Sequence, residues 1–236
     1  MRMPRIRLFA GPNGSGKSTL VETLRPIIPL YHYLNPDILE QTLRDTGSLE
    51  LAPWELTFTQ RQARAFVRRH PLGNSEFAKR VAVDANVLRI PGHLVEGYAA
   101  SVLSDLFRRH WVSRGISFSF ESVMSSPDKV DLLKDARRQG YRTYLYFVCT
   151  ESPTISEGRV RARVLQGGHG VPAHKIVKRY GKSLALLKGA IAQSHRAYLY
   201  DNSGSELTFL AEFENAKLVR KISQLPDWFR QYAIED

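Results

Sequence analysis

The chain has 236 residues, of which 43% are hydrophobic and 24% are charged. This composition excludes an intrinsically disordered protein, and the length suits one domain that carries an insertion. No apolar run approaches the ~18 residues of a membrane-spanning helix, so we expect a cytoplasmic protein without a membrane partner. Lys and Arg total 34 against 23 Asp and Glu, a formal net charge of +11, which favours an anionic partner.

The N-terminal region predicts a strand, a glycine-rich loop and a helix in succession. Residues 5–10 form a short apolar-rich run, and a helical stretch extends from about Lys17 to Leu24. The loop between them reads GPNGSGKS and matches the pattern G-x-x-x-x-G-K-[ST]. Because it opens a helix, its backbone amides and the helix dipole are suited to holding phosphates. The predicted ATP site, a P-loop, consists of Gly11, Pro12, Asn13, Gly14, Ser15, Gly16, Lys17, Ser18 and Thr19.

Two side chains of this loop have predicted chemical roles. Lys17 is placed to reach the β and γ phosphates of ATP, and the Ser18 hydroxyl is placed to ligate Mg²⁺. The alternative is a glycine-rich turn with an incidental lysine. The preceding strand and the following helix argue against it.

A second short run at 31–35 leads into a helix that Asn35 is predicted to cap, with Pro36 at the first helical position. Asp37 follows directly and is the first candidate for the carboxylate that accepts a proton from the substrate. Its alternative role is to complement the dipole of the helix without taking part in chemistry. Residues 47–115 then show helical periodicity with Pro and Gly breaks, which predicts a helical insertion.

The second half of the chain alternates strands with helices. Residues 116–120 read as a strand that places Glu121 at its end, and 142–148 and 196–200 read as further strands. Such alternation is typical of an α/β fold whose mostly parallel sheet is covered by helices. We predict a single P-loop kinase-like domain over 1–236. Cys149 falls within an apolar run, which indicates a buried, unreactive thiol.

The stretch from Arg159 to Lys182 contains seven Lys or Arg residues and no Asp or Glu. Arg159 and Arg163 are four apart and share one helix face, while Val160 and Val164 share another that can pack inward. This pattern predicts a phosphate-facing lid at about 152–182. A solvated basic face is the alternative.

Five segments occur in an order that resembles the zeta toxin family. They are AGPNGSGKST, NPD at 35–37, FES at 120–122, RVRARVLQGGHGVPAHKIVKRY at 159–180 and YDNSG at 200–204. The resemblance implies a P-loop kinase that phosphorylates a sugar hydroxyl of a nucleotide sugar such as UDP-N-acetylglucosamine. An antitoxin protein is a further implied partner.

The same resemblance implies roles for individual residues. Asp37 acts as the general base, Glu121 binds the acceptor hydroxyl or a magnesium water, and Arg163 and Arg179 clamp the triphosphate. Arg159 is assigned to ATP binding as well. For His169 the argument comes from the glycines on both sides, whose flexible setting predicts a contact with phosphate or a role in loop closure, and a turn histidine is the alternative. Val123 stands where a threonine is common in the family, so this chain departs from the family pattern next to Ser122.

Other functions remain open from the sequence. A polynucleotide kinase would use the same loop, aspartate and arginines and would explain the positive charge more directly, but no nucleic-acid module is evident. A nucleotide-dependent switch or binding ATPase is a third reading, although the guanine-reading N-K-x-D pattern is absent. Asp201 and Asn202 are expected to form a structural turn rather than to contact a nucleotide.

Overall fold

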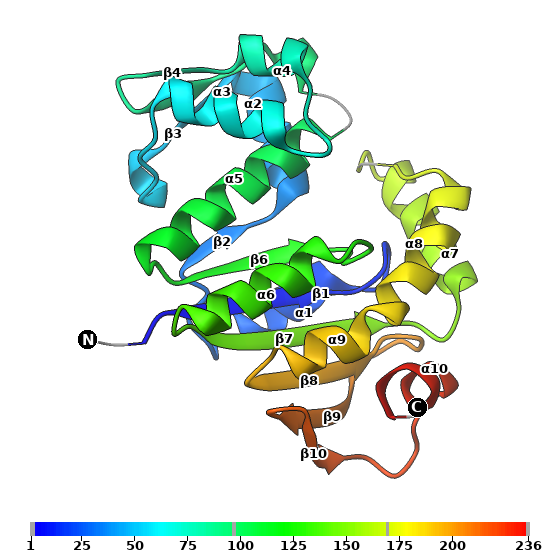
Figure 1. Ribbon diagram of the computed structural model, residues 1–236. Coiled ribbons are helices and arrows are strands. Elements are labelled where there is room, and N and C mark those ends of the chain that lie inside the picture. Colours follow the sequence, from blue (N-terminus) through cyan, green and yellow to red (C-terminus); the bar gives the residue numbers. More distant parts are fainter. Residues whose placement is uncertain (1–2, 96–97, 169, 235–236) are drawn as a thin grey trace. The chain divides into compact units, whose positions relative to one another are not determined.

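The computed structural model describes residues 3–95, 98–168 and 170–234 (Figure 1). The chain divides into two compact units, which we call the sheet unit (1–31 and 119–236) and the helical unit (32–118). The prediction of one domain with an insertion at 47–115 and a lid at 152–182 stays a prediction. The elements of the sheet unit are β1 (Arg5–Ala10), α1 (Lys17–Leu24), β6 (Phe118–Ser122), α6 (Asp128–Arg138), β7 (Arg142–Cys149), α7 (Pro153–Leu165), α8 (Ala173–Ala185), α9 (Leu187–Ala192), β8 (Arg196–Asp201), β9 (Thr208–Glu214), β10 (Lys217–Lys221), α10 (Asp227–Phe229) and a π-helical turn (Arg230–Ile234).

A mostly parallel core forms the centre of the sheet unit, where the strand order is β10-β9-β8-β7-β1-β6. β7 pairs in parallel with both β1 and β8, whereas β9 and β10 are antiparallel additions. The register places Leu8 beside Leu145 and Leu145 beside Ala197, so these side chains form one buried row across three strands. The predicted α/β fold with a mostly parallel sheet is therefore confirmed.

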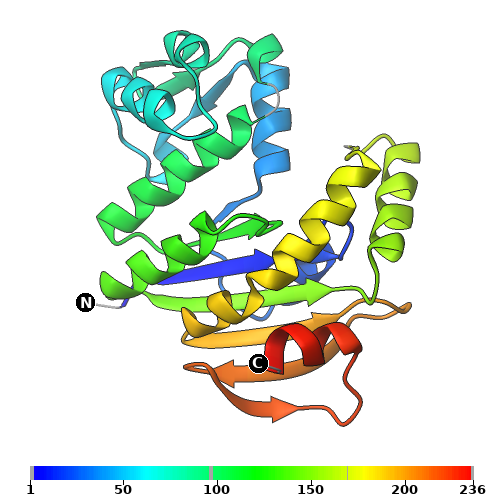
Figure 2. The same ribbon diagram turned by 45° about the vertical axis from the view of Figure 1, so that its right-hand side comes forward.

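Helices cover both faces of this sheet, with α6 and α9 on one side and α1 on the other (Figures 1 and 2). The sequence of α6 explains why this helix packs on the sheet. Leu132, Leu133 and Ala136 are buried on one side of a helix that is otherwise charged. The C-terminal segment closes the core, because Trp228 and Phe229 pack against Phe147 and Phe213 with ring centroids 6.0 and 6.4 Å apart. The core thus supports the strand ends at which the glycine-rich loop begins.

The helical unit packs around the long helix α5. Its elements are β2 (His32–Leu34), α2 (Pro36–Thr46), β3 (Ser48–Glu50), a 3₁₀ turn (Ala52–Trp54), α3 (Gln60–Arg69), α4 (Ser75–Arg80), β4 (Ala82–Asp84), β5 (Val87–Arg89), a second 3₁₀ turn (Gly92–Leu94) and α5 (Ala99–Arg114). Trp111 of α5 is fully buried, and its ring lies 5.6 Å from His32 and 6.3 Å from Trp54. The small antiparallel sheet β3-β5-β4 was not predicted, because strands of three residues are too short to show an alternating pattern.

Side-chain caps fix the starts of α2 and α3. The Asn35 side-chain oxygen accepts a hydrogen bond from the Asp37 amide at 2.9 Å, and Pro36 occupies the first turn, as predicted. At α3, the Thr59 hydroxyl accepts from the Gln62 amide while the Gln62 side chain accepts from the Thr59 amide. This reciprocal pair determines where α3 begins.

Two features of the second half do not follow from the sequence pattern. The helical sequence over 173–193 forms two helices, α8 and α9, that meet at Leu186, and β10 is an additional strand. All five residues of β10 are exposed, so a buried face could not reveal it. Among the described residues, no helix has the length and apolar character needed to cross a membrane.

Candidate active site

The loop between β1 and α1 begins where a buried strand ends. β1 ends at Ala10, and the Gly11 amide donates a hydrogen bond to the carbonyl of Ser122 at 3.3 Å, which ties the loop to the end of β6. Gly16 precedes α1 with φ at 99°, a left-handed conformation that favours glycine. The loop and the start of α1 therefore have the backbone conformation that a phosphate-binding strand–loop–helix requires.

Helix α7 packs directly against this loop. Gly14 has φ at 73°, and a Cβ atom added there would clash with the carbonyl oxygen of Ser156, a buried residue of α7. The Ser156 hydroxyl is in turn 3.1 Å from that of Thr150, just beyond β7. The glycine at position 14 thus allows the basic helix α7 to approach the loop closely.

Lys17 is the first residue of α1, and its side chain turns back over the loop. The ammonium nitrogen donates hydrogen bonds to the carbonyl oxygens of Gly11 and Pro12, at 2.9 and 2.8 Å. These contacts hold the positive charge against the loop. The structure places the Lys17 ammonium group beside the glycine loop. Its role in catalysis stays a prediction.

Ser18 and Glu121 come together across 103 residues of sequence. The Ser18 hydroxyl lies 3.2 and 3.3 Å from the two carboxylate oxygens of Glu121. Glu121 is 5% exposed, because it belongs to the buried strand β6, which lies next to β1. Glu121 is therefore not an exposed carboxylate at the end of a strand. A buried carboxylate therefore faces the hydroxyl that was predicted to bind Mg²⁺.

These residues fit both ATP and Mg²⁺. The side-chain oxygens of Asn13 and Ser15 are buried and have no hydrogen-bond partner among the described residues, so the loop retains unused polar groups. A hydroxyl and a carboxylate are oxygen ligands of the kind that Mg²⁺ uses together with substrate phosphates. No group of three or more His, Cys, Asp or Glu residues gathers elsewhere in the described ranges, so a separate all-protein metal site is not seen there.

Asp37 belongs to the helical unit, where it stands in the first turn of α2. Its amide is held by Asn35, and its side chain is exposed. The first-turn position suits a residue that complements the helix dipole. Exposure also leaves the carboxylate accessible to a substrate, so both of its predicted roles stay open.

The predicted lid residues lie on α7 and α8. Arg159 donates to the carbonyl of Gly204 at 3.1 Å, which anchors its guanidinium at the turn after β8. Arg163 and Arg179 are both half-buried, and the Arg163 carbonyl accepts a hydrogen bond from the Gly168 amide at 2.9 Å. His169 lies outside the described residues. The clamping roles of these residues stay predictions.

One expectation for α7 is wrong. Val160 is buried as predicted, but Val164 is 45% exposed and the adjacent Leu165 is 85% exposed. Val164 belongs to the last turn of α7, just before the Gln166–Gly168 turn, so its spacing from Val160 did not ensure burial. α8 is held more firmly, because the Tyr180 hydroxyl donates to the Thr150 carbonyl at 2.5 Å.

The turn after β8 has a role that the sequence did not reveal. The Asn202 side-chain nitrogen donates to the carbonyl of Ser15 at 2.9 Å, and a Cβ atom added to Gly16 would clash with the same amide. Asp201 is structural, as expected, since its carboxylate accepts from the Ser203 amide and the Trp228 indole, each at 2.8 Å. The available signal for Asn202 was its place directly after a core strand.

Cys149 is the last residue of β7 and is fully buried. Burial raises the pKa of its thiol to about 12, so the thiol stays protonated at neutral pH. The predicted unreactive character of this cysteine agrees with its position in the core.

Comparison with known proteins gives a family match over part of the chain and a similar fold. Residues 95–209 match the family model described as zeta toxin. No curated protein sequence matches the chain. The crystal structure of AvrRxo1-ORF1:-ORF2 with ATP is similar, with a TM-score of 0.56 and 13% identity over 98% of this chain and 64% of that chain. The same complex with sulphate ions gives a TM-score of 0.55 and 12% identity over 99% and 66% of the two chains.

A third similar structure comes from the PezAT chromosomal toxin-antitoxin system of Streptococcus pneumoniae. It has a TM-score of 0.48 and 13% identity, and covers 87% of this chain and 72% of that chain. The present chain spans just under two thirds of the AvrRxo1-ORF1:-ORF2 chains that it matches. At these identities the likeness establishes the fold, and the family match adds the relationship predicted from the sequence. Over residues 95–209, which are just under half of the chain, the sequence is similar to the zeta toxin family.

Proposed function

We propose that the protein is an ATP-dependent phosphotransferase that moves the γ-phosphate of ATP to a hydroxyl group of a small molecule. The observation that carries the proposal is the pairing of Ser18 with the buried Glu121, at 3.2 and 3.3 Å, beside a glycine loop that holds Lys17. The zeta toxin family match and the kinase-like fold support a P-loop kinase-type phosphotransferase. The AvrRxo1-ORF1:-ORF2 structure with ATP supports the choice of nucleotide.

Each part of the site has a task in this reaction. The loop amides and the Lys17 ammonium bind and orient the phosphates, while Ser18 and Glu121 hold Mg²⁺ directly or through its water. Mg²⁺, when bound, neutralises the charge of the phosphate oxygens. Arg163 and Arg179 stabilise the charge that develops on the transferred group, and α7 excludes water from it.

The transfer itself forms a bond from the acceptor oxygen to the γ-phosphorus and breaks the bond from that phosphorus to the oxygen bridging to the β-phosphate. ADP leaves with the bridging oxygen, and the acceptor hydroxyl gives its proton to the Asp37 carboxylate. A positioned base of this kind contributes roughly 10² to 10⁴ in rate.

For the acceptor, the family relationship supports a nucleotide sugar such as UDP-N-acetylglucosamine. An antitoxin protein is the corresponding proposed partner, because the similar structures are named as a two-component complex and as a toxin-antitoxin system. A polynucleotide kinase remains the second candidate, since the net charge of +11 suits a nucleic-acid acceptor.

The experiment that tests the proposal combines labelled ATP and Mg²⁺ with separate pools of nucleotide sugars, nucleosides and nucleic-acid ends. Transfer by the wild type identifies the acceptor class. Lys17→Ala should abolish that transfer without unfolding the chain, because the ammonium group supplies charge rather than core packing. Lys134→Ala, which removes an exposed lysine of α6, is the matched control. Transfer by Lys17→Ala within twofold of wild type would overturn the kinase assignment.

A further inference from the structure

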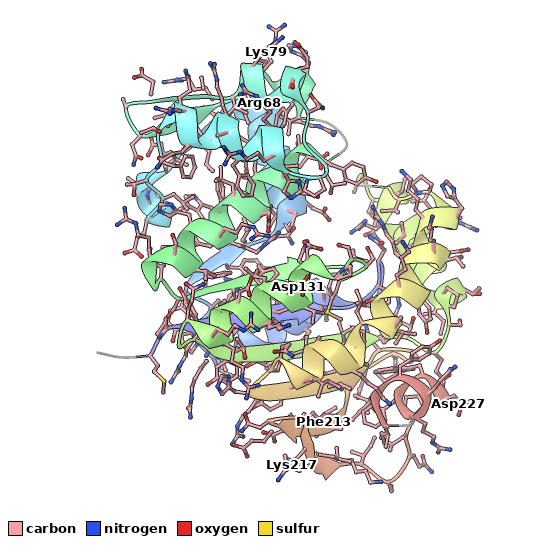
Figure 3. All side chains as sticks on the ribbon, in the orientation of Figure 1. Arg68, Lys79, Asp131, Phe213, Lys217 and Asp227 are labelled. Atoms are coloured by element: carbon pink, nitrogen blue, oxygen red, sulfur yellow. The ribbon has the colours of Figure 1, made fainter. Side chains whose placement is uncertain are left out.

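Helix α3 carries four arginines within ten residues, and we call them the α3 basic face: Arg61, Arg64, Arg68 and Arg69. Arg61, Arg64 and Arg68 are spaced by three and four residues, so they follow one side of the helix. With Gln60 and Ala65, the four arginines line a surface groove of about 440 Å³. Figure 3 marks Arg68 on α3 and Lys79 on the neighbouring α4. The groove thus has a positively charged wall along a whole helix.

In the part of the helical unit that the structure describes, no carboxylate pairs with this face. Among the described residues, none of its four arginines forms an ion pair with an acidic side chain. The sequence from 56 to 75 contains no Asp or Glu at all. Arg80 of α4 differs, because it pairs with Glu76 at 3.2 Å, as exposed arginines commonly do. The α3 basic face therefore concentrates positive charge that the helical unit leaves uncompensated.

One member of the face is held in place by neutral groups. Arg64 donates hydrogen bonds to the carbonyl oxygens of Val81 and Lys79, at 2.7 and 3.0 Å. These contacts fix the guanidinium without cancelling its charge. Arg61 and Arg68 are exposed on either side of it, so one oriented cation stands between two adaptable ones. A rigid cation loses less side-chain entropy when it binds an anion.

A second groove runs along the adjacent side of α3. It has a volume of about 350 Å³ and is lined by Phe58, Phe66 and His110 together with Arg109 and Arg114. Phe66 is half-buried, so part of its ring is available to a ligand. None of the described residues that line this groove is acidic, and of its two arginines Arg109 pairs with Asp105 at 2.7 Å. Aromatic surface and positive charge therefore meet on two neighbouring sides of one helix.

We propose that the α3 basic face is a binding site for single-stranded nucleic acid. Its arginines contact successive backbone phosphates, and Phe66 provides a surface on which a base stacks. Positive charge that tracks a backbone, combined with aromatic rings, is how proteins bind single strands without sequence preference. An acidic peptide would satisfy the arginines but would leave the aromatic groove unused. The site lies wholly within the helical unit and does not depend on phosphotransfer.

The test measures fluorescence anisotropy of a labelled single-stranded RNA and a labelled single-stranded DNA with the full chain, without ATP, at several salt concentrations. Arg61→Ala/Arg68→Ala removes two exposed charges that form no hydrogen bond or ion pair with another described residue. It should weaken binding by on the order of tenfold and reduce the slope of log K against log salt by about 1.4. Arg25→Ala/Arg138→Ala is the matched control, since it removes the same charge from arginines that pair with Glu22 and Asp135. This control should change the slope much less.

Two further measurements make the proposal specific. Phe66→Leu keeps an apolar side chain but removes the ring, so it should weaken strand binding by roughly tenfold while leaving the salt slope unchanged. Labelled polyglutamate should bind more weakly than either strand. Absence of strand binding by wild type, equal losses in the two double variants, or tighter binding of polyglutamate would each overturn the proposal. None of these results bears on the proposed phosphotransfer, which is measured with ATP.

Discussion

The side-chain nitrogen of Asn202 donates a hydrogen bond to the carbonyl oxygen of Ser15 at 2.9 Å, although 187 residues separate them. The backbone N–H of Asn202 also donates a hydrogen bond to the carbonyl oxygen of Cys149 at 2.8 Å. Asn202 therefore connects the end of β7 with the middle of the glycine loop. The contact restrains the loop in the conformation that presents its N–H groups.

Asn202→Ala should weaken ATP binding by about tenfold, because the Ser15 carbonyl loses its partner and the loop loses a restraint. Asn202→Asp keeps the shape but offers an acceptor to that carbonyl and adds negative charge, so the loss should be larger. Isothermal titration calorimetry measures both affinities, and thermal unfolding checks the fold. Wild-type affinity in both variants would mean that the loop does not need Asn202.

Glu121→Gln should raise the Mg²⁺ concentration required for half-maximal transfer by about tenfold, since the amide is a poorer magnesium ligand than the carboxylate. Ser18→Ala should act in the same direction. Because the two side chains contact each other, their effects should not be independent. The double variant should raise the required Mg²⁺ concentration by less than the two single effects combined. Magnesium titrations of transfer measure this. A change confined to the acceptor KM would instead assign Glu121 to the acceptor hydroxyl.

Asp37→Asn should preserve ATP affinity and lower turnover by roughly 10² to 10⁴, because the shape is kept and the proton acceptor is lost. The helix start should survive, since Asn35 caps the amide of Asp37 and not its carboxylate. Asp45→Asn, on the exposed part of the same helix, is the matched control. If the two variants turn over equally, Asp37 serves only the helix dipole.

Arg163→Ala and Arg179→Ala should each lower kcat more than they weaken ATP binding, because contacts to the transferred group strengthen as its charge develops. A reduction on the order of 10³ is typical of such arginines. Arg161→Ala is the control, since Arg161 is exposed on the same helix as Arg163. Steady-state kinetics at saturating acceptor give both constants. Equal small effects at all three positions would assign the stretch to a solvated basic face.

Local patterns explain what the sequence predicted well. The residues of β1, the glycine loop and the start of α1 are consecutive, and their chemistry requires that order. The cap at Asn35 is also local, because it involves residues within one helical turn. The pairing of Ser18 with Glu121 is different. It depends on β6 lying beside β1, which neither segment encodes alone.

The remaining errors also have physical causes. The residues around Leu186 continue the helical pattern of α8 into α9, so the division between them depends on packing rather than on a breaker residue. The burial of Val164 was predicted from its spacing to Val160, but burial also requires a facing surface. Asn202 escaped notice because an Asn in a turn is common, and its partner is far away in sequence.

The exposed strand β10 ends the sheet order on one side, with Lys217 visible in Figure 3. Its outer edge pairs with no other described strand, and such an edge could template pairing with a strand of another molecule. Three of its five residues are positively charged, namely Lys217, Arg220 and Lys221. Two such edges repel each other, so the strand resists edge-to-edge aggregation. Replacing these charges with Thr or Val would remove that protection while leaving the core intact.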